Sequence, residues 1–187
     1  IREEDGFGLR PNIGIRGAAA ERSQKVTIMR DGVLITPAPY SAPAAYYIPN
    51  VSRIASVEVL KGPAATAYGP HTVGGAINLA SPSIPEGGPE GFIDLSAGSD
   101  GYYKGQFSYG ATEGNFGYAF DVLSYGADGF KWVDRSNQDT GFERNDIGIK
   151  VAYALPQSRF EHRVSFLLEV GDEVADETYL GLTDDDF

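Results

Sequence analysis

Strict alternation of apolar and polar residues in the second half of the chain constrains the fold more than any other feature of the sequence. Between Tyr103 and Ala111 the odd positions are aromatic or small, and the even positions are mostly polar. The same two-residue period recurs in four more segments, residues 91–98, 116–122, 147–155 and 160–170. It is weakest in the first of these. Because successive side chains of a β-strand point to opposite faces, each segment is predicted to be a strand with one apolar and one polar face.

The length of the alternating segments favours strands that cross a membrane. About 10 residues at ~3.3 Å each, tilted by ~40°, project to ~25 Å, which matches the apolar band of an outer-membrane barrel. Strands of soluble proteins are usually shorter. The connections are short at residues 99–102, 112–115 and 156–158, but long and polar at residues 127–143. Short turns at one end and longer loops at the other are typical of such barrels.

A soluble β-sandwich or a lipocalin-like barrel would show the same alternation with its faces reversed. The apolar face would then pack inward, whereas in a membrane barrel the charged side chains would point into a wet lumen. The charged residues in question are Lys104, Asp121, Lys150, Glu161, Arg163 and Glu169. Five strands cannot close a barrel of this height, so either more strands follow or the sheet has open edges, which natural proteins avoid. Periodicity alone leaves both architectures open.

The first half of the chain has a mixed pattern of short strands, proline-rich loops and helical turns. Short apolar strands are predicted at residues 12–16, 26–29, 57–60 and 76–80. Asn50 is expected to cap a short helix over residues 51–54, and Pro63 to begin another over residues 64–67.

The segment from Ser81 to Pro89 is rich in proline and glycine and marks the predicted domain boundary. We therefore expect a mixed α/β domain over residues 1–88. Antiparallel transmembrane barrel strands, five of them, are expected over residues 89–187.

The composition argues against several functions. Asp and Glu outnumber Lys and Arg by 26 to 15, a net charge of −11, so the chain lacks the basic face with which nucleic-acid-binding domains neutralise phosphates. It has no cysteine, which excludes disulfides and thiolate-bound metal within these residues. No motif for nucleotide binding or nucleophilic catalysis is complete. We predict no catalytic residue, no resident metal and no cofactor.

Five short strings in the first half carry a family resemblance. They are Ile15–Gly17 (IRG), Asp31–Gly32 (DG), Ile54–Pro63 (IASVEVLKGP), Tyr68–Gly69 (YG) and Val73–Asn78 (VGGAIN). In their order and spacing the chain resembles the TonB-dependent outer-membrane receptors, in which a plug domain precedes a barrel. A later string, TYLGLTD at Thr178–Asp184, is similar to an extracellular loop of ferric-citrate-type members. The energy-coupling box, the first part of the plug and most of the twenty-two barrel strands are expected to lie outside this sequence.

The resemblance implies energised uptake of a scarce, large solute across the bacterial outer membrane, with no chemistry on the solute. The plug would fill the lumen of the lipid-embedded barrel. The inner-membrane protein TonB, with ExbB and ExbD, would pull on the plug using the proton gradient. The solute expected first is a ferric siderophore or ferric-citrate-like chelate, followed by cobalamin, haem, nickel chelates or oligosaccharides. Iron would then be cargo and not a cofactor.

By the same resemblance, three charged plug residues are expected to latch the plug to the barrel. Arg16 and Lys61 occupy positions where the family carries basic residues paired with barrel-wall glutamates, and Glu58 serves the same scaffold. Removing one partner of a desolvated ion pair leaves the other charge unpaired at a high free-energy cost, which suits a latch. Solvated charges at strand ends are the alternative.

The glycines of the five strings are expected to serve the backbone, through positive φ or close approach, and not to bind the solute. They are Gly17, Gly32, Gly62, Gly69, Gly74 and Gly75.

Contacts to the solute are expected in two plug loops. The loop Thr36–Tyr47 resembles the apical loop of ferric-dicitrate receptors, although alanines stand at positions 42 and 44 where those receptors carry glutamines. Arg22, in the loop Ala18–Ser23, is a candidate for attracting an anionic chelate. The candidates that offer hydroxyls and ring faces are Tyr40, Ser41, Tyr46 and Tyr47. Packing without ligand contact is the competing interpretation.

Two functions from other classes compete with transport. The first is a soluble β-rich binding module in which the first half is an independent domain. The second is an enzyme such as a carbohydrate hydrolase that uses acidic loop residues, for example Asp134 and Asp139. Such an enzyme needs two carboxylates at a defined separation beside a cleft, and the spacing of the acidic residues does not favour it.

Overall fold

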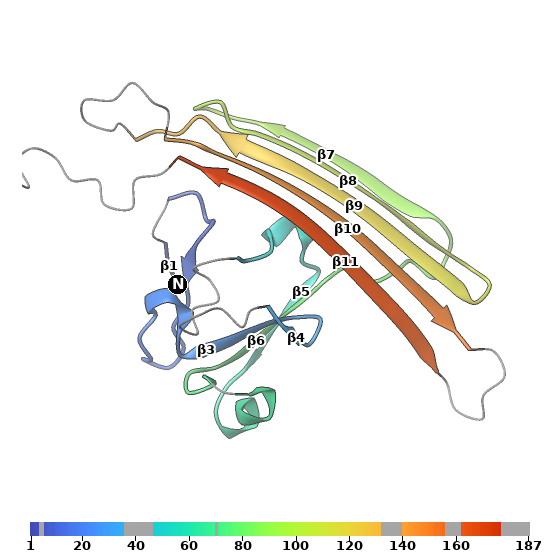
Figure 1. Cartoon of the computed structure of the whole chain (residues 1–187), viewed down its shortest axis with the longest axis horizontal. Helices are drawn as coiled ribbons and strands as arrows, with labels where there is room; N and C mark the ends of the chain where they lie inside the picture. The colour runs from blue at the N-terminus through green and yellow to red at the C-terminus, as the bar shows by residue number, and fades with distance from the viewer. Residues whose placement is uncertain (4–5, 36–46, 70, 132–139, 156–161, 177–187) are drawn as a thin grey trace, which may run out of the picture. The chain divides into compact units, whose positions relative to one another are not determined.

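The chain was analysed as a computed structural model that describes residues 1–187 except 4–5, 36–46, 70, 132–139, 156–161 and 177–187. It divides into two compact units, Ile1–Ser83 and Ile84–Phe187, which we call the plug unit and the strand unit. Figure 1 shows the strands and turns of each unit.

The plug unit is built on a four-stranded sheet. Its strands are β3 (Val26–Arg30), β4 (Val33–Leu34), β5 (Ser56–Leu60) and β6 (Gly75–Ala80), in the order β4-β3-β6-β5. The central pair β3 and β6 is parallel, and both outer pairs are antiparallel. A separate two-stranded sheet joins β1 (Arg2–Glu3) to β2 (Pro11–Asn12). The helical segments are 3₁₀ turns, η1 (Glu21–Ser23), η4 (Val51–Arg53) and η5 (Pro63–Tyr68).

The central strands of the plug unit are covered on both faces. Every residue of β3 is buried, because one face packs on loops and the other on η5. The first cluster is formed by Val26, Ile28, Ile77 and Leu79 with isoleucines of the surrounding loops. On the other face Met29 packs with Ala65 and Ala76. Small residues at 65 and 76 let the 3₁₀ turn approach the sheet closely.

Both predicted helix starts are confirmed. The Asn50 side chain accepts a hydrogen bond from the Ser52 N–H at 2.8 Å, which satisfies a donor at the start of η4. Pro63 begins η5, where its lack of an N–H costs nothing.

The strand expected over residues 12–16 is wrong beyond Asn12, where β2 ends. The Ile13 N–H donates to Ser23 Oγ at 3.0 Å and not to a neighbouring strand. Arg16 then takes a left-handed φ of 56° in a turn closed by the Ala18 N–H on the Ile15 carbonyl at 3.1 Å. Apolar residues at positions 13 and 15 therefore reflect packing on the core from a loop, not strand alternation.

The strand unit is a five-stranded antiparallel meander, as the alternation predicted. Its strands are β7 (Glu90–Ala97), β8 (Tyr103–Glu113), β9 (Phe116–Ala127), β10 (Phe142–Ala154) and β11 (Arg163–Ala175). Each pairs with its neighbours in sequence (Figure 1). The last four strands have 11 to 13 residues, enough at ~3.3 Å per residue to cross the apolar part of an outer membrane. In the described residues no helix is long and apolar enough to span a membrane.

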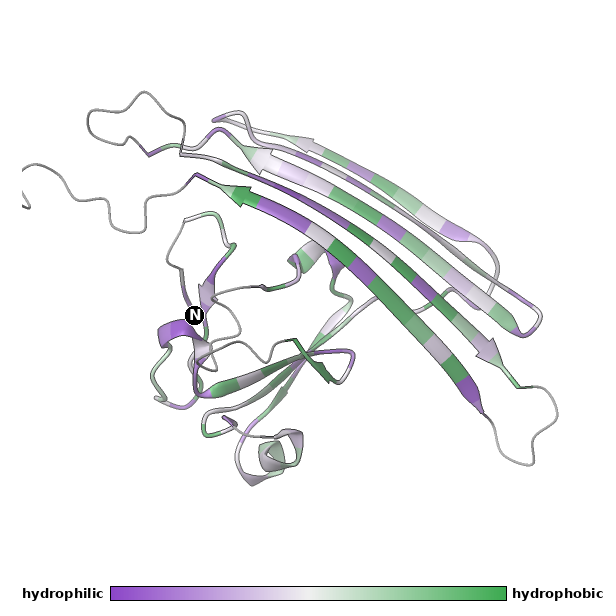
Figure 2. Cartoon of the chain, viewed as in Figure 1, coloured by the Kyte–Doolittle hydropathy of each residue, from purple (hydrophilic) through white to green (hydrophobic). Residues whose placement is uncertain are grey.

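The register gathers the apolar residues of all five strands on one face, which we call the apolar face. One cross-strand row runs from Ile93 through Phe107, Val122 and Ile147 to Val170. Figure 2 shows the resulting hydrophobic and hydrophilic bands alternating along the strands. The large apolar side chains exposed on this face are Ile93, Leu95, Tyr103, Phe107, Tyr109, Phe116, Phe120, Ile147, Ile149, Tyr153, Val164, Phe166, Leu168, Val170 and Val174.

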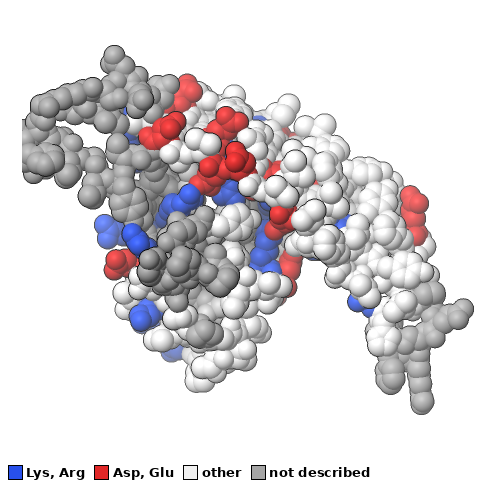
Figure 3. Space-filling model, viewed as in Figure 1, with Lys and Arg blue, Asp and Glu red and all other residues white. Residues whose placement is uncertain are grey.

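The opposite side of the sheet, which we call the polar face, carries the charged side chains. The next cross-strand row runs from Asp94 through Gln106, Leu123 and Asp146 to Gly171. In the space-filling view, much of the visible surface of the strand unit bears neither acidic nor basic atoms (Figure 3). Charge is thus confined by the pleat to one face and to the strand ends.

Replacing Gly75 by alanine should destabilise the plug unit. Gly75 has φ 149°, and an added Cβ would lie 2.5 Å from the Leu60 carbonyl oxygen, a backbone atom of the paired strand. We expect the free energy of unfolding to fall by about 2 kcal/mol or more. Denaturant titration of the purified protein measures it. Gly87→Ala is the control, because nothing lies within 4 Å of its added Cβ, and equal losses for both variants would contradict the account.

Candidate functional site

The turn at Asp31–Gly32 joins β3 to β4 and is tied to the adjacent end of the parallel strand β6. Asp31 and Gly32 have φ of 48° and 79°, the left-handed pair that a two-residue hairpin prefers. The Asp31 carboxylate accepts from the Ser81 N–H at 2.8 Å and from the Ser81 hydroxyl at 2.5 Å. The turn therefore holds the residue at which the chain leaves β6.

Asn78 links the same turn to β5. Its side-chain oxygen accepts from the Gly32 N–H at 2.9 Å, and its amide nitrogen donates to Glu58 Oε2 at 3.0 Å. Glu58 and Asn78 are also paired in register across β5 and β6. Residues from three of the five family strings thus meet in one polar network across the sheet.

The structure places Arg16, one of the three expected latch residues, beside the residue that follows Lys61. Arg16 Nη1 lies 3.2 Å from where a Cβ on Gly62 would be. Arg16 and Lys61 are both exposed. Glu58 differs from them, because its carboxylate is engaged by Asn78 within the plug sheet. The latch itself stays a prediction.

The glycines of the strings occupy restricted positions. Gly62 has φ 78°, and the Arg16 guanidinium lies beside it. An added Cβ at Gly74 would be 3.0 Å from the Lys25 carbonyl oxygen. The remaining members with positive φ are Gly17, Gly32, Gly69 and Gly75.

Most of the expected solute contacts lie outside the described residues. This holds for Tyr40, Ser41 and Tyr46, whereas Tyr47 is described and half-buried. The string Thr178–Asp184, likened above to an extracellular loop, also lies outside the described residues.

The loop that carries Arg22 is held from within. Arg22 is half-buried with φ 48°, and its backbone N–H donates to Asn12 Oδ1. Ser23 is fully buried, and its hydroxyl accepts from Ile13 and donates to the Pro11 carbonyl at 3.3 Å. A left-handed backbone costs a non-glycine residue about 1 kcal/mol or more. These hydrogen bonds therefore stabilise a loop conformation that is unfavourable for the isolated chain.

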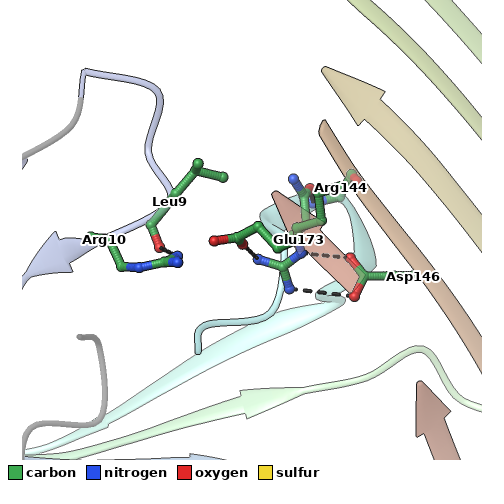
Figure 4. A network of polar contacts seen from close by, with 7 residues as sticks. Leu9, Arg10, Arg144, Asp146 and Glu173 are labelled. Carbon is green, nitrogen blue, oxygen red and sulfur yellow. Dashed lines mark hydrogen bonds and ion pairs between the residues drawn. The ribbon is translucent and has the colours of Figure 1, made fainter. Parts of the chain in front are cut away.

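A buried ion cluster on the polar face was not predicted (Figure 4). Arg144 on β10 contacts Asp146 through Nε at 2.9 Å and Nη2 at 3.4 Å, and Glu173 on β11 through Nη1 at 3.1 Å. Arg144 and Asp146 are 2% and 1% exposed. Gly171 makes room for the cluster, because a Cβ there would lie 2.6 Å from Asp146 Oδ1.

A sequence signal for this cluster does exist. Arg144 and Asp146 both fall on the even, polar positions of the alternating segment that contains Lys150. The predicted segment begins at residue 147, whereas β10 begins at Phe142. Extending the predicted segment back by five residues, to Phe142, places Arg144 and Asp146 on the same face as Lys150.

Among the described residues, no group of three or more histidine, cysteine, aspartate or glutamate side chains is arranged to hold a metal ion. The polar networks of both units are instead built from hydrogen bonds and ion pairs. Among the described residues they hold neighbouring turns and strands together.

Comparison with known proteins places these features in a family. The family model described as "TonB-dependent Receptor Plug Domain" matches residues 1–76. Residues 1–76, most of the plug unit, are a plug domain of the TonB-dependent receptor type. It is 28% identical over 179 residues, 95% of its length, to the vitamin B12 transporter BtuB of Photobacterium profundum, of which it covers 26%.

Solved structures of receptors share the fold. The siderophore receptor PirA from Acinetobacter baumannii aligns with 96% of this chain and 28% of its own, at 18% identity and a TM-score of 0.61. A mutant of the ferric enterobactin receptor PfeA from Pseudomonas aeruginosa, in complex with enterobactin, aligns with 89% of this chain and 27% of its own, at 18% identity and a TM-score of 0.62. The receptor chain described here therefore spans about a quarter of the length of these proteins.

Replacing Arg144 by methionine should destabilise the receptor strongly. The substitution leaves the buried Asp146 carboxylate without its guanidinium, and breaking a buried pair in this way costs about 3–5 kcal/mol. Thermal or denaturant unfolding of the purified receptor measures the loss.

Arg163→Met is the matched control. Its pair with Glu86 is long, 3.4 Å, and the side chains are 52% and 77% exposed, so its loss should cost less than about 1 kcal/mol. Equal costs for the two variants would show that burial does not set the importance of the cluster.

Proposed function

We propose that the receptor containing this chain takes up a scarce solute across the bacterial outer membrane, driven by TonB. The observation that carries the proposal is the apolar face of the strand unit, which spans all five strands. Side chains on it are exposed on both edge and inner strands, among them Ile93 (70%) on β7, Ile147 (47%) on β10 and Phe166 (60%) on β11. Soluble proteins rarely leave so continuous an apolar surface in water, whereas lipid covers it readily.

The polar face supports the same proposal. A lipid-facing side cannot hold Lys104, which pairs with Asp94 at 2.5 Å, or the cluster around Arg144. With lipid on one side and charges on the other, the five strands have the sidedness of a barrel wall around a wet lumen. The plug unit, which belongs to the plug domain family, is then the element that occupies the lumen.

TonB, acting with ExbB and ExbD, is the partner we propose for energy coupling. The support is the match of residues 1–76 to the plug domain of the TonB-dependent receptors. Transport then involves no bond making or breaking, so we assign no enzymatic activity and no resident cofactor.

The solute we propose is a ferric siderophore or similar chelate, with cobalamin as the second candidate. Two solved relatives are receptors for siderophores, and the curated relative is a vitamin B12 transporter. Arg22 supports an anionic solute, because the bonds of Asn12 and Ser23 hold its loop in one conformation. A prearranged cation loses less entropy when it binds an anion.

Insertion of the strands in lipid is tested by Ile149→Arg. Ile149 lies near the middle of β10 on the apolar face, and arginine near the bilayer midplane costs about 2–4 kcal/mol in folding free energy. Unfolding of the receptor from lipid bilayers measures the cost. Lys150→Arg, which keeps a cation on the other face, should be silent. If the protein is instead stable in water without detergent and tolerates Ile149→Arg, the soluble binding module is favoured.

Transport is tested in cells that lack their own siderophore and cobalamin receptors. With the full-length receptor restored, we expect accumulation of ⁵⁵Fe-labelled chelates that stops when a protonophore collapses the proton gradient. Binding of the same chelates and of cobalamin to purified receptor identifies the class of solute. Arg22→Ala should weaken binding of an anionic chelate about tenfold or more.

Lys25→Ala, which removes an exposed cation of the same unit, is the control for charge alone. Equal effects of the two variants would assign the change to net charge. Binding of cobalamin but of no ferric chelate would reverse the order of the two solutes.

A further inference from the structure

The first residues of the strand unit, Ile84 to Glu86, dock onto its polar face; we call them the strap. Ile84 is only 4% exposed. A Cβ on Gly117 would lie 3.0 Å from Ile84 Cγ2, and a Cβ on Gly110 would lie 2.9 Å from Pro85 Cδ. The polar face is therefore lined with glycine where the strap crosses β8 and β9, and the missing side chains leave the space that the strap fills.

Polar contacts hold the strap in the same place. The Thr112 hydroxyl donates to the Pro85 carbonyl at 2.6 Å. Glu86 reaches Arg163 on β11 at 3.4 Å, an exposed pair that contributes little by itself. Burial of Ile84 and the Thr112 bond are thus the main attachments.

The chain immediately before the strap is fastened to the other unit. The Ala80 carbonyl accepts from the Ala55 N–H at 2.8 Å, and both polar groups of Ser81 are bound by Asp31. Two residues, Pro82 and Ser83, follow before the strap begins at Ile84, where the strand unit starts.

We propose that the strap is a positioning element for transport, which stays docked on the barrel wall while the plug rearranges. The proposal rests on the proposed transport function. A force on the plug would be transmitted along the chain as far as Ile84. The docked strap would resist it there, because releasing the strap exposes a buried isoleucine and opens a hollow over Gly110 and Gly117. Rearrangement of the plug would then end before Ile84, and β7 would keep its place in the sheet.

A disulfide that locks the strap tests this in the full-length receptor. Ile84→Cys combined with Gly117→Cys places two Cβ atoms at most about 4.5 Å apart, since Ile84 Cγ2 is one bond from its Cβ, and this is within disulfide range. The 187 residues contain no other cysteine. We expect uptake by the oxidised double variant to stay within about twofold of uptake by the same variant after reduction.

The outcomes separate the two proposals. Loss of uptake in the oxidised form that returns on reduction would overturn the strap proposal and leave transport intact. Absence of energised uptake in the unmodified receptor would instead overturn the proposed function. Thiol labelling under denaturing conditions confirms that the disulfide has formed.

Protease cleavage after Glu86 gives a readout that does not depend on transport. Gly117→Ala puts a methyl group against Ile84 and Thr112, and Ile84→Ala removes the buried side chain, so both should raise the cleavage rate of the folded receptor by a glutamate-specific protease about tenfold. Gly105→Ala on β8 is the control, because its nearest neighbour is Leu95 Cδ2 at 3.7 Å. Unchanged cleavage in both test variants would show that the strap is not held by these contacts.

Discussion

The two-residue period of the β-pleat is the constraint on which the rest of the strand unit depends. Because the register aligns Ile93, Phe107, Val122, Ile147 and Val170 across five strands, a slip by one residue would exchange the apolar and polar faces of a whole strand. Such a slip between β10 and β11 would put charged side chains among apolar ones and separate Arg144 from Glu173. Sidedness and register therefore specify each other, and the sidedness is what a barrel wall needs.

The plug unit solves a different problem, since its sheet is short and its strands come from distant parts of the chain. Here the family strings act as connectors. Asn78 joins Gly32 to Glu58, and Asp31 joins the hairpin turn to Ser81. Side-chain hydrogen bonds thus replace the length that a four-stranded sheet with a two-residue edge strand lacks. The charged and amide residues of the strings stand at these positions because they reach across strands.

How far the sequence predicts the structure differs between the two units. The five strands follow from alternation, and the starts of η4 and η5 follow from Asn50 and Pro63, because these signals are local. The end of β2 does not, since a hydrogen bond from Ile13 to a serine ten residues away decides it. Alternation extended back to Arg144 places it on the same face as Asp146, but its pairing with Glu173 and the docking of the strap depend on the register between strands, which a single sequence does not contain.

The polar face is not uniform, and its variation bears on how a wall tolerates a moving plug. Where the chain enters the sheet the face is lined with glycine and receives the strap. Further along, Arg144 has two of its acidic partners on β10 and β11, within the strand unit itself. A guanidinium neutralised by its own wall keeps that pairing when another element shifts, whereas one paired only with the plug would be left buried and uncompensated. Under the proposed function, both features would keep the fold of the strands independent of the conformation of the plug.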